Sequence, residues 1–343
     1  MLPTYEQRIA EIVRQQPKWS GEQIARHLRD ENPEAPGRSA VYECLRRLQI
    51  GGPTRPPTAP APIIKQLEQE KQDLRQTIEQ LVRDRAAQYT IPSQQDVIRY
   101  GVIADTQVGS LYVRFDALKT FYRHVAKHGI TDILHAGDVL DGWRLYRGQE
   151  WELRDRGWEE QLDRLESDCP HEKGITTHFI TGNHDASFKH PIGIDVGAEI
   201  VKRRPDFHFL GEDVGRVVFE NKTKAKWIVD LIHPSGGTAY ALSYHLQKII
   251  ESLSGGTKPH MIVVGHYHKA ELIPQYRNVV GLQAGTFQSQ TPFMARKHIA
   301  AHLGGWIIEV AVGVAPDCLV NTVKAQCISF FEPMGGETGE KNG

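Results

Sequence analysis

The sequence predicts an α/β protein built as a two-sheet sandwich, preceded by a small all-α domain and a short coiled coil. Short apolar runs bounded by turn residues recur in the second part of the chain, and helix-like sequence separates the first of them, as in consecutive strands of an α/β sheet. The clearest runs cover residues 98–104, 133–136, 177–181, 227–232 and 261–264. Residues 1–50 instead place apolar side chains at helical spacing. A chain of 343 residues with 40% hydrophobic content can bury one large core and one smaller one.

Residues 1–50 are predicted to form three short helices. Ile9 and Ile12 fall at helical spacing in the first, and Ser20 followed by Gln23 is a capping-box pattern that starts the second. The third follows a turn over residues 33–37. The unit resembles the helix-turn-helix modules of DNA-binding proteins, which place their last helix against DNA. The contacts that this resemblance implies lie on the outward side of the third helix, at Arg38, Ser39, Tyr42, Arg46 and Arg47.

A second interpretation of the same helices stays open. Acidic residues are interspersed with the arginines and dilute the positive charge that phosphate contacts require. They are Glu22, Glu31, Glu34 and Glu43. The unit could therefore be a small helical adaptor whose arginines are solvated.

Two connecting segments follow. Residues 51–62 are rich in proline, which excludes helix and central strand and predicts a semi-stiff linker. Residues 63–89 keep a heptad phase and predict a short coiled coil, through which the chain could form a homo-oligomer. Three heptads are marginal for an isolated coil, so the apolar stripe could instead lie against the following domain.

Polar side chains follow each apolar run where the expected strand ends. Asp138 and Asp141 follow the run at 133–136, and Asn183 and His184 follow the run at 177–181. In α/β sheets ligands bind beyond the carboxyl ends of the strands, so these groups should face one crevice. The same arrangement recurs at Asp105, Gln107, His233, His266 and His268.

The order of these motifs, with Gly-Asp-x-x-Asp, Gly-Asn-His-Asp and Gly-His-x-His, resembles the calcineurin-like metallophosphoesterase family over residues 97–332. The resemblance implies two divalent ions bridged by Asp138. One ion would be completed by Asp105, Gln107 and His268, and the other by Asn183, His233 and His266. Mixed oxygen and nitrogen ligands suit Mn²⁺, Fe or Zn²⁺, and we expect Mn²⁺.

The resemblance also implies a mechanism. A hydroxide bridging the two ions would attack phosphorus in line. His184 would protonate the leaving oxygen or stabilise the transition state, and Asp141 would orient and charge it by a hydrogen bond. We therefore expect a phosphodiesterase or nuclease that acts on nucleic acid. The alternative is a DNA-binding or assembly protein whose phosphoesterase domain is weakly active or inactive.

The sequence departs from the family pattern at two positions. Gln107 stands where most members have histidine, which weakens the first metal site and favours the inactive alternative. Gly142 follows Asp141 where phosphoprotein phosphatases have a phosphate-binding arginine, although Arg144 could reach the substrate phosphate instead. The missing arginine favours phosphodiester substrates.

Residues 143–173 interleave aromatic residues and arginines and support two interpretations. Trp143, Tyr146 and Trp151 alternate with arginines in a composition that could stack on a nucleic-acid strand. Leu162 and Leu165 follow helical spacing instead, which is typical of an ordinary helical cap over the site.

Charge and composition limit the remaining classes. A net charge of -1 and a pI near 7.0 give no global field toward nucleic acid, so such binding must use local patches. No Cys-x-x-Cys pair, apolar leader or membrane-spanning run is present, so we expect a cytoplasmic protein without membrane insertion. Residues 333–343 lack core-forming side chains and predict a disordered tail.

Overall fold

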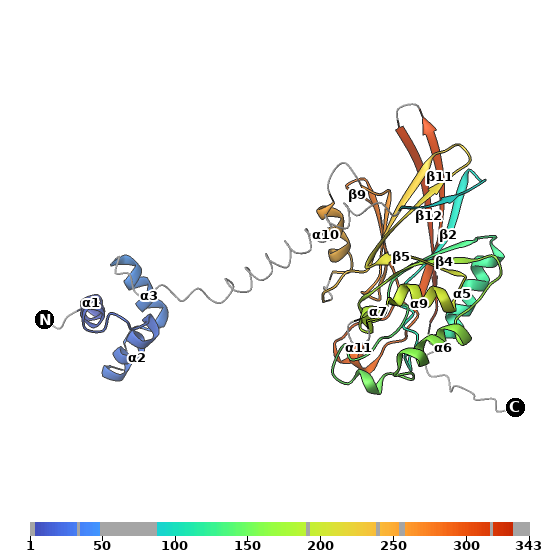
Figure 1. Cartoon of the computed structure of the whole chain (residues 1–343). Coiled ribbons are helices and arrows are strands. Elements are labelled where there is room, and N and C mark those ends of the chain that lie inside the picture. Colours follow the sequence, from blue (N-terminus) through green and yellow to red (C-terminus); the bar gives the residue numbers. More distant parts are fainter. Residues whose placement is uncertain are drawn as a thin grey trace. The chain divides into compact units, whose positions relative to one another are not determined.

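The computed structural model describes residues 4–32, 35–48, 88–189, 193–237, 241–253, 258–315 and 318–331 (Figure 1). The chain divides into two units, Met1–Gln80 and Leu81–Gly343, and each is described by itself. The predicted linker at 51–62, nearly all of the coiled coil at 63–89 and the tail at 333–343 lie outside the described residues.

The N-terminal unit contains the three predicted helices, α1 (Tyr5–Gln15), α2 (Gly21–Glu31) and α3 (Arg38–Arg47). Capping boxes begin two of them, with Thr4 paired to Gln7 and Ser20 paired to Gln23. The apolar faces meet in one small core. Its fully buried members include Ile9, Ile12, Ile24, Leu28, Val41 and Leu45.

The larger unit is an α/β fold with two mixed sheets, as predicted. Among the described residues each sheet has six strands. The first sheet runs in the order β1 (Gln88–Pro92), β6 (Val214–Glu220), β7 (Lys226–Ile232), β8 (Met261–Val264), β10 (Val279–Ala284) and β9 (Ala270–Tyr276). The second runs in the order β12 (Cys318–Ser329), β11 (Gly304–Ala315), β2 (Val97–Ile103), β3 (Asp132–Ala136), β4 (Thr176–Thr181) and β5 (Phe207–Glu212).

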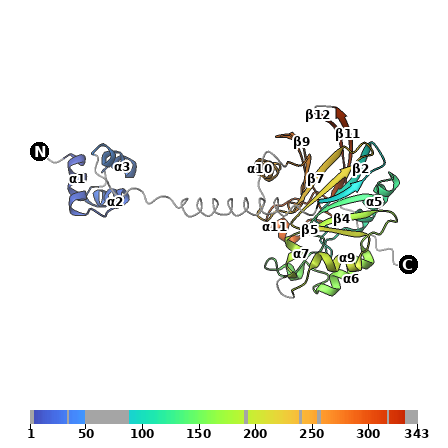
Figure 2. The same ribbon diagram turned by 45° about the horizontal axis from the view of Figure 1, so that its top comes forward.

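Helices cover the outer faces of both sheets. The longer ones over the second sheet are α5 (Phe115–Lys127), α6 (Trp158–Asp168) and α9 (Val196–Arg203), which gather on one side in both views (Figures 1 and 2). The first sheet is covered by α10 (Tyr244–Ser252). Shorter helical turns are η1 (Gln149–Trp151), α7 (Asn183–Ala186) and α11 (Pro292–Arg296). The layers are therefore helix, sheet, sheet, helix.

The core between the sheets fixes how they face each other. Trp227 of β7 and Tyr100 of β2 are almost fully buried there, and the indole Nε1 donates a hydrogen bond of 2.9 Å to the phenol oxygen. Burying two large aromatic side chains contributes several kcal/mol, by the usual value of about 25 cal/mol per Å² of apolar surface. The indole N–H is paired with the tyrosine oxygen, and the tyrosine hydroxyl donates to the sulfur of Met261, so this contact joins the two sheets without an unpaired donor.

The carboxyl ends of the central strands converge on one edge. In the second sheet β2, β3 and β4 run parallel, and in the first β7 and β8 run parallel. A hydrogen bond of 2.7 Å joins the two edges, because Nδ1 of His233 after β7 donates to the carbonyl oxygen of Ala136 at the end of β3. This common edge carries the predicted metal ligands.

The structure corrects the sequence analysis at several elements. Gln88 and Tyr89, predicted as the end of the coiled coil, belong to β1, so the folded unit begins before the predicted residue 97. Its parallel pairing with β6 is a tertiary contact that the local pattern did not reveal. Strands β5, β6, β9 and β12 were also missed. In the described part of the chain no helix is both long and apolar enough to cross a membrane.

Candidate metal centre

Five of the predicted ligands have a backbone conformation that side chains rarely adopt. Their φ angles are positive: Asp105 50°, Gln107 51°, Asp138 56°, His266 77° and His268 54°. Each residue in this left-handed region costs about 1–3 kcal/mol, and such strain is typical of functional sites held by the surrounding fold. The conformation of the loops after β2, β3 and β8 therefore lowers the stability of the fold, and it directs these side chains toward one point.

The centre of the site is a cluster of one carboxylate and two imidazoles. Ligand atoms of Asp138, His233 and His266 all lie within 4.8 Å of one another. His233 Nε2 is 3.1 Å from Asp138 Oδ2. The amide oxygen of Asn183 lies 3.1 Å from His233 Nε2 and 2.9 Å from His266 Nδ1. The amide oxygen of Asn183 thus lies in the same cluster, between the two imidazoles.

Asp105, Gln107 and His268 form the other side of the centre. His268 Nε2 is 3.4 Å from Asp105 Oδ1, and Gln107 Nε2 donates to Asp138 Oδ2 at 3.2 Å. Gln107 is fully buried and its Oε1 has no hydrogen-bond partner. Turning the amide over would exchange these two atoms and bring the oxygen to face Asp138, the orientation that a cation there would favour.

These residues fit divalent metal ions. Buried polar atoms normally have partners, yet Gln107 Oε1 and both carboxylate oxygens of Asp141 have no hydrogen bond. Carboxylate, amide oxygen and imidazole donors converge from five loops on a buried point. Such a donor set suits first-row divalent ions, and bound cations would offset the cost of burying the carboxylates.

His184 stands at the rim of the centre with one ring nitrogen free for chemistry. Nδ1 donates to the main-chain oxygen of Asp141 at 2.7 Å, while the Asp141 carboxylate Oδ1 is 3.3 Å away. Its Nε2 lies 4.0 Å from Asp138 Oδ2. The orienting hydrogen bond predicted for the Asp141 side chain is therefore made by the Asp141 main chain, and the carboxylate acts on the ring mainly through its charge.

The surrounding charges favour protonated imidazoles in the metal-free chain. Burial by itself lowers the pKa of His184, but the charges of Asp138 and Asp141 outweigh burial and raise it to about 9. Burial likewise opposes the charge on His233, and Asp138 raises the pKa of that ring to about 10. In turn, although burial opposes ionisation of Asp138, the facing rings hold its pKa well below the usual value. A cation bound by His233 would have to displace the proton on that ring.

Two motif glycines are required by the close packing of the centre. A Cβ on Gly182 would overlap Asp138 Oδ1 and the ring of His233. A Cβ on Gly142 would overlap the main-chain oxygen of His184, and its φ of 74° also disfavours any side chain. The backbone conformation and the close contact at position 142 therefore exclude an arginine side chain directly after Asp141.

The sequence analysis missed Asp185, the last residue of the Gly-Asn-His-Asp motif. Its buried carboxylate accepts three main-chain hydrogen bonds, from Val139 at 3.1 Å, Leu140 at 2.8 Å and Gly182 at 2.9 Å. Burial and the charge of Asp138 raise its pKa to about 7. Asp185 ties the loops after β3 and β4 together. Its place beside Asn183 and His184 was the only signal in the sequence.

The segment after the second motif is mostly packed rather than free to stack. Trp143 and Trp158 pack against the core under α6, and Tyr146 stacks on Phe293 at 4.1 Å between centroids. Trp151 is the exception, with 74% of its surface exposed. Arg144 is exposed and its guanidinium lies 5.4 Å from the Trp143 ring centre, so its contact with substrate stays a prediction.

The predicted DNA contacts on α3 divide into two groups. Arg38, Ser39, Arg46 and Arg47 are exposed, but Arg38 is 3.5 Å from Glu22 and Arg47 is 3.4 Å from Glu6. Tyr42 is half-buried, because its ring packs against Gly21 of α2, where a Cβ would come within 2.7 Å of it. The glycine on α2 makes room for this ring, which stays partly exposed, so a contact of Tyr42 with DNA stays a prediction.

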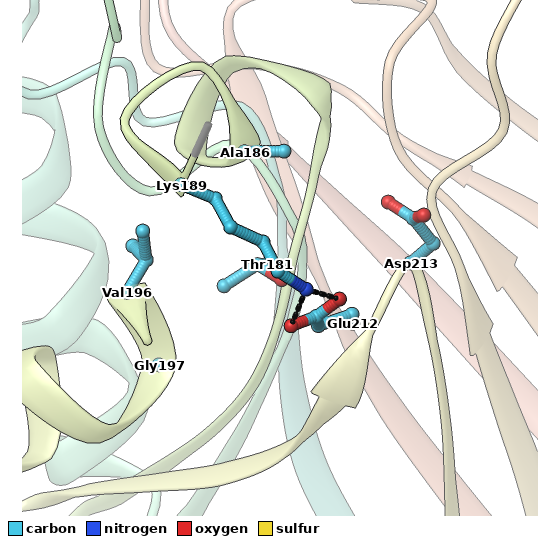
Figure 3. A pocket seen from close by; sticks show the side chains of 7 residues that line it. All are labelled: Thr181, Ala186, Lys189, Val196, Gly197, Glu212 and Asp213. Atoms are coloured by element: carbon cyan, nitrogen blue, oxygen red, sulfur yellow. Dashed lines mark hydrogen bonds and ion pairs between the residues drawn. The ribbon is translucent and has the colours of Figure 1, made fainter. Parts of the chain in front are cut away.

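A small pocket lies beside the centre rather than in it (Figure 3). It is lined by Thr181, Ala186, Lys189, Val196, Gly197, Glu212 and Asp213. The ammonium of Lys189 donates to both carboxylate oxygens of Glu212 at 2.7 Å, which neutralises the charge of that carboxylate. None of the predicted metal ligands lines it, so we assign the chemistry to the strand-end cluster.

A fold with two packed sheets and a buried carboxylate–imidazole cluster at their common edge defines the class of calcineurin-like phosphoesterases. Residues 98–270 match the sequence model of that family, and the chain belongs to it. The family usually binds divalent metals and is generally hydrolytic. A search of curated protein sequences gave no match.

Solved structures give distant likenesses. Vacuolar protein sorting 29 from Cryptosporidium parvum has 12% identity and a TM-score of 0.34, covering 68% of this chain and 99% of its own. GAP50 of Plasmodium, the anchor in the inner membrane complex, has 11% identity and a TM-score of 0.39, covering 69% and 90%. The nuclease MPE of Pseudomonas putida has 14% identity and a TM-score of 0.29, covering 65% and 87%. Likenesses this distant carry no inference about activity.

Proposed function

We propose that this protein is a two-metal phosphodiesterase or nuclease that acts on nucleic acid. The observation that carries the proposal is the buried cluster of Asp138, His233 and His266, with His184 beside it. Two bound divalent ions, which we expect to be Mn²⁺, would supply the activated water for in-line attack on phosphorus and would neutralise the charge of the transition state.

Side chains of the protein would hold the metal ions in position and would protonate the leaving oxygen. Asp138 stands between the two ligand groups, because it faces both Gln107 and His233. The ring of His184 is held by the Asp141 main chain through Nδ1, which leaves Nε2 to give a proton to the leaving oxygen. In the metal-free chain the neighbouring carboxylates raise the pKa of His184, which favours the protonated ring that this role requires.

Phosphodiesters suit this site better than phosphomonoesters. A terminal phosphate carries more charge than a diester and is usually held by a planar arginine fork. The backbone at Gly142 excludes a side chain in the position after Asp141. The position after Asp141 therefore offers no cation to a dianionic group, and a diester needs less charge neutralisation.

A single set of assays tests the proposal. The full-length protein with Mn²⁺ should hydrolyse bis(p-nitrophenyl) phosphate and single- or double-stranded DNA faster than p-nitrophenyl phosphate. Asp138→Asn should lose bound metal and lower turnover more than about 100-fold, because its charge holds both ions. Asp163→Asn, an equal change on the exposed face of α6, is the control. Wild-type turnover by Asp138→Asn would exclude the two-metal mechanism.

The second candidate function is a DNA-binding or assembly protein with a weakly active phosphoesterase domain. The observation that favours it is the hydrogen bond from the Gln107 amide to Asp138, which occupies the carboxylate with a neutral donor. Metal content distinguishes the two functions. Fewer than two bound ions with no turnover on any phosphodiester would support this second candidate.

We further propose that the N-terminal unit binds duplex DNA through α3. Arg46 and Ser39 are exposed on that helix, as phosphate contacts require. Arg46→Glu should weaken duplex binding at low salt and reduce the dependence of affinity on salt. Arg14→Glu at the end of α1 makes the same change of charge and should matter less. Equal effects of the two variants would leave only a general charge effect and contradict a role for α3.

A further inference from the structure

A large aromatic side chain stands exposed next to the metal centre. Trp151 has 74% of its surface exposed, although tryptophan is highly buried on average in folded proteins. An exposed indole raises the question of what covers it. In the described part of the chain Leu111, whose main chain bonds to that of Glu152, is another exposed large apolar residue, at 47%.

The indole is mounted on a fixed support rather than on a free loop. Trp151 ends η1, and two polar residues close to it on the chain are buried, Gln149 at the start of η1 fully and Glu152 directly after Trp151 to within 3%. Gln149 Nε2 donates to the main-chain oxygen of Asp141 at 2.9 Å. The Glu152 carboxylate accepts from the Tyr146 hydroxyl at 2.9 Å. A ring held in this way loses little conformational entropy when a ligand covers it.

The same support is joined to the loop that carries Gln107. The main chain of Glu152 accepts a hydrogen bond of 2.9 Å from Leu111, and Arg154 donates one of 2.8 Å to Gly109. The segment that carries Trp151 is therefore tied to two loops of the metal centre, one containing Asp141 and the other containing Gln107.

One guanidinium lies over the indole, and two more arginines are exposed on or beside the same segment. The guanidinium of Arg156 lies 5.8 Å from the Trp151 ring centre, and Arg154 is also exposed. Arg296 exposes 64% of its side chain and lies 3.9 Å from the buried carboxylate of Glu152. An aromatic face interleaved with arginines matches the stacked bases and spaced phosphates of a single strand. An apolar protein partner would instead favour a patch with few charges.

We propose that Trp151 stacks on a base of single-stranded nucleic acid whose scissile phosphate lies at the metal centre, while Arg154 and Arg156 contact the neighbouring phosphates. This inference rests on the proposed phosphodiesterase function and adds a substrate-binding residue to it. Stacking accepts any base, so Trp151 gives affinity for unpaired nucleotides rather than a preferred sequence.

Binding measured without cleavage tests the inference directly. Fluorescence anisotropy in EDTA compares a fluorescein-labelled thymidine oligonucleotide of about six nucleotides, long enough for one binding site, with an abasic oligonucleotide of equal length. Trp151→Ala should weaken binding of the thymidine strand by about 5- to 100-fold, the effect of losing one stacked base. Its binding of the abasic strand should be unchanged, and Trp151→Phe should retain most of the affinity.

The controls separate this inference from the proposed function. Tyr244→Ala removes a half-exposed aromatic on α10 and should change nothing. With Mn²⁺, Trp151→Ala should have a higher KM for single-stranded DNA than wild type has, and Tyr244→Ala should not. Wild-type affinity for the thymidine strand, or equal loss for both strands, would overturn base stacking. Stacking-dependent binding by a protein that hydrolyses no phosphodiester would overturn the proposed function alone.

Discussion

Nε2 of His233, at the end of one sheet, lies 3.1 Å from Oδ2 of Asp138, at the end of the other. Both side chains are buried, and the His233 ring is fixed by its second nitrogen on the main chain of Ala136. A charged carboxylate and an imidazole so placed are costly to bury unless they are paired or hold a cation. The junction of the two sheets is therefore also the place where metal binding and folding are coupled.

Replacing His184 should separate catalysis from metal binding. His184→Ala should lower kcat on bis(p-nitrophenyl) phosphate about 100-fold, the usual size of a general-acid contribution. Metal content should stay near wild type, because Nε2 lies outside the tight cluster, 4.0 Å from Asp138. Elemental analysis alongside turnover decides the matter, and joint loss of metal and activity would make His184 a ligand instead.

Gln107 should make the first metal site the weaker one. An amide oxygen is a poorer donor than imidazole for Mn²⁺, Fe and Zn²⁺, so Gln107→His should lower the metal concentration needed for half-maximal activity. The same variant should also differ from wild type in substrate preference, because a ligand exchange alters the ion that faces the phosphate. Titration followed by activity and by calorimetry gives the answer. Superimposable curves for the two proteins would show that Gln107 is not a ligand.

Gly182 should tolerate no side chain. Gly182→Ala places a methyl group against Asp138 and His233, so metal affinity should fall by at least about 10-fold, since displaced ligands commonly cost that much. Gly157→Ala is the matched control, because its Cβ would meet Glu160 at an ordinary 3.5 Å. Isothermal calorimetry compares the two variants. Equal affinities would mean that the loop relaxes freely around the added methyl group.

The metal-free protein should lose stability as pH rises from about 6.5. In the folded chain the pKa of His184 is raised to about 9 and that of His233 to about 10, from the ordinary histidine value of 6.5. A raised pKa gives stability that is complete below the unfolded value and is lost as pH rises through the folded one. Denaturant unfolding in EDTA at pH 6.5 and pH 9 measures this. His184→Gln should flatten the decline, and a stability that increased over this range would contradict the assigned charges.

Metal affinity should follow the opposite trend over the same range. The proton on His233 competes with a cation for the ring nitrogen and for the charge of Asp138. Raising the pH removes this proton, so binding should tighten toward pH 9, and binding at lower pH should release a proton to the buffer. Calorimetry in buffers of different ionisation enthalpy counts the protons released, and zero release at pH 7 would indicate a neutral His233 ring.

Local patterns predicted much of this fold because they reflect contacts between near neighbours. The run before Gly265 became β8 (Met261–Val264), and Ser20 with Gln23 caps α2 as its sequence indicates. By contrast, the first two residues of β1, Gln88 and Tyr89, were assigned to a coiled coil, because the strand with which β1 pairs in the described structure, β6, lies far away along the chain. An edge strand without a clear alternation is visible only through its pairing.

The sequence alone determined which groups gather at the strand ends, because a strand period and a polar residue after it are local properties. Motif order then pointed to one family and to the residues that could hold metal. Only the tertiary structure decided how those groups meet: that the Asp141 main chain orients His184, that Asp185 joins two loops, and that the backbone path at Gly142 excludes an arginine. The same holds for Trp151, whose neighbours are buried while its ring is exposed. These relations depend on distances of a few ångströms between segments remote in sequence, which close packing sets and local pattern does not.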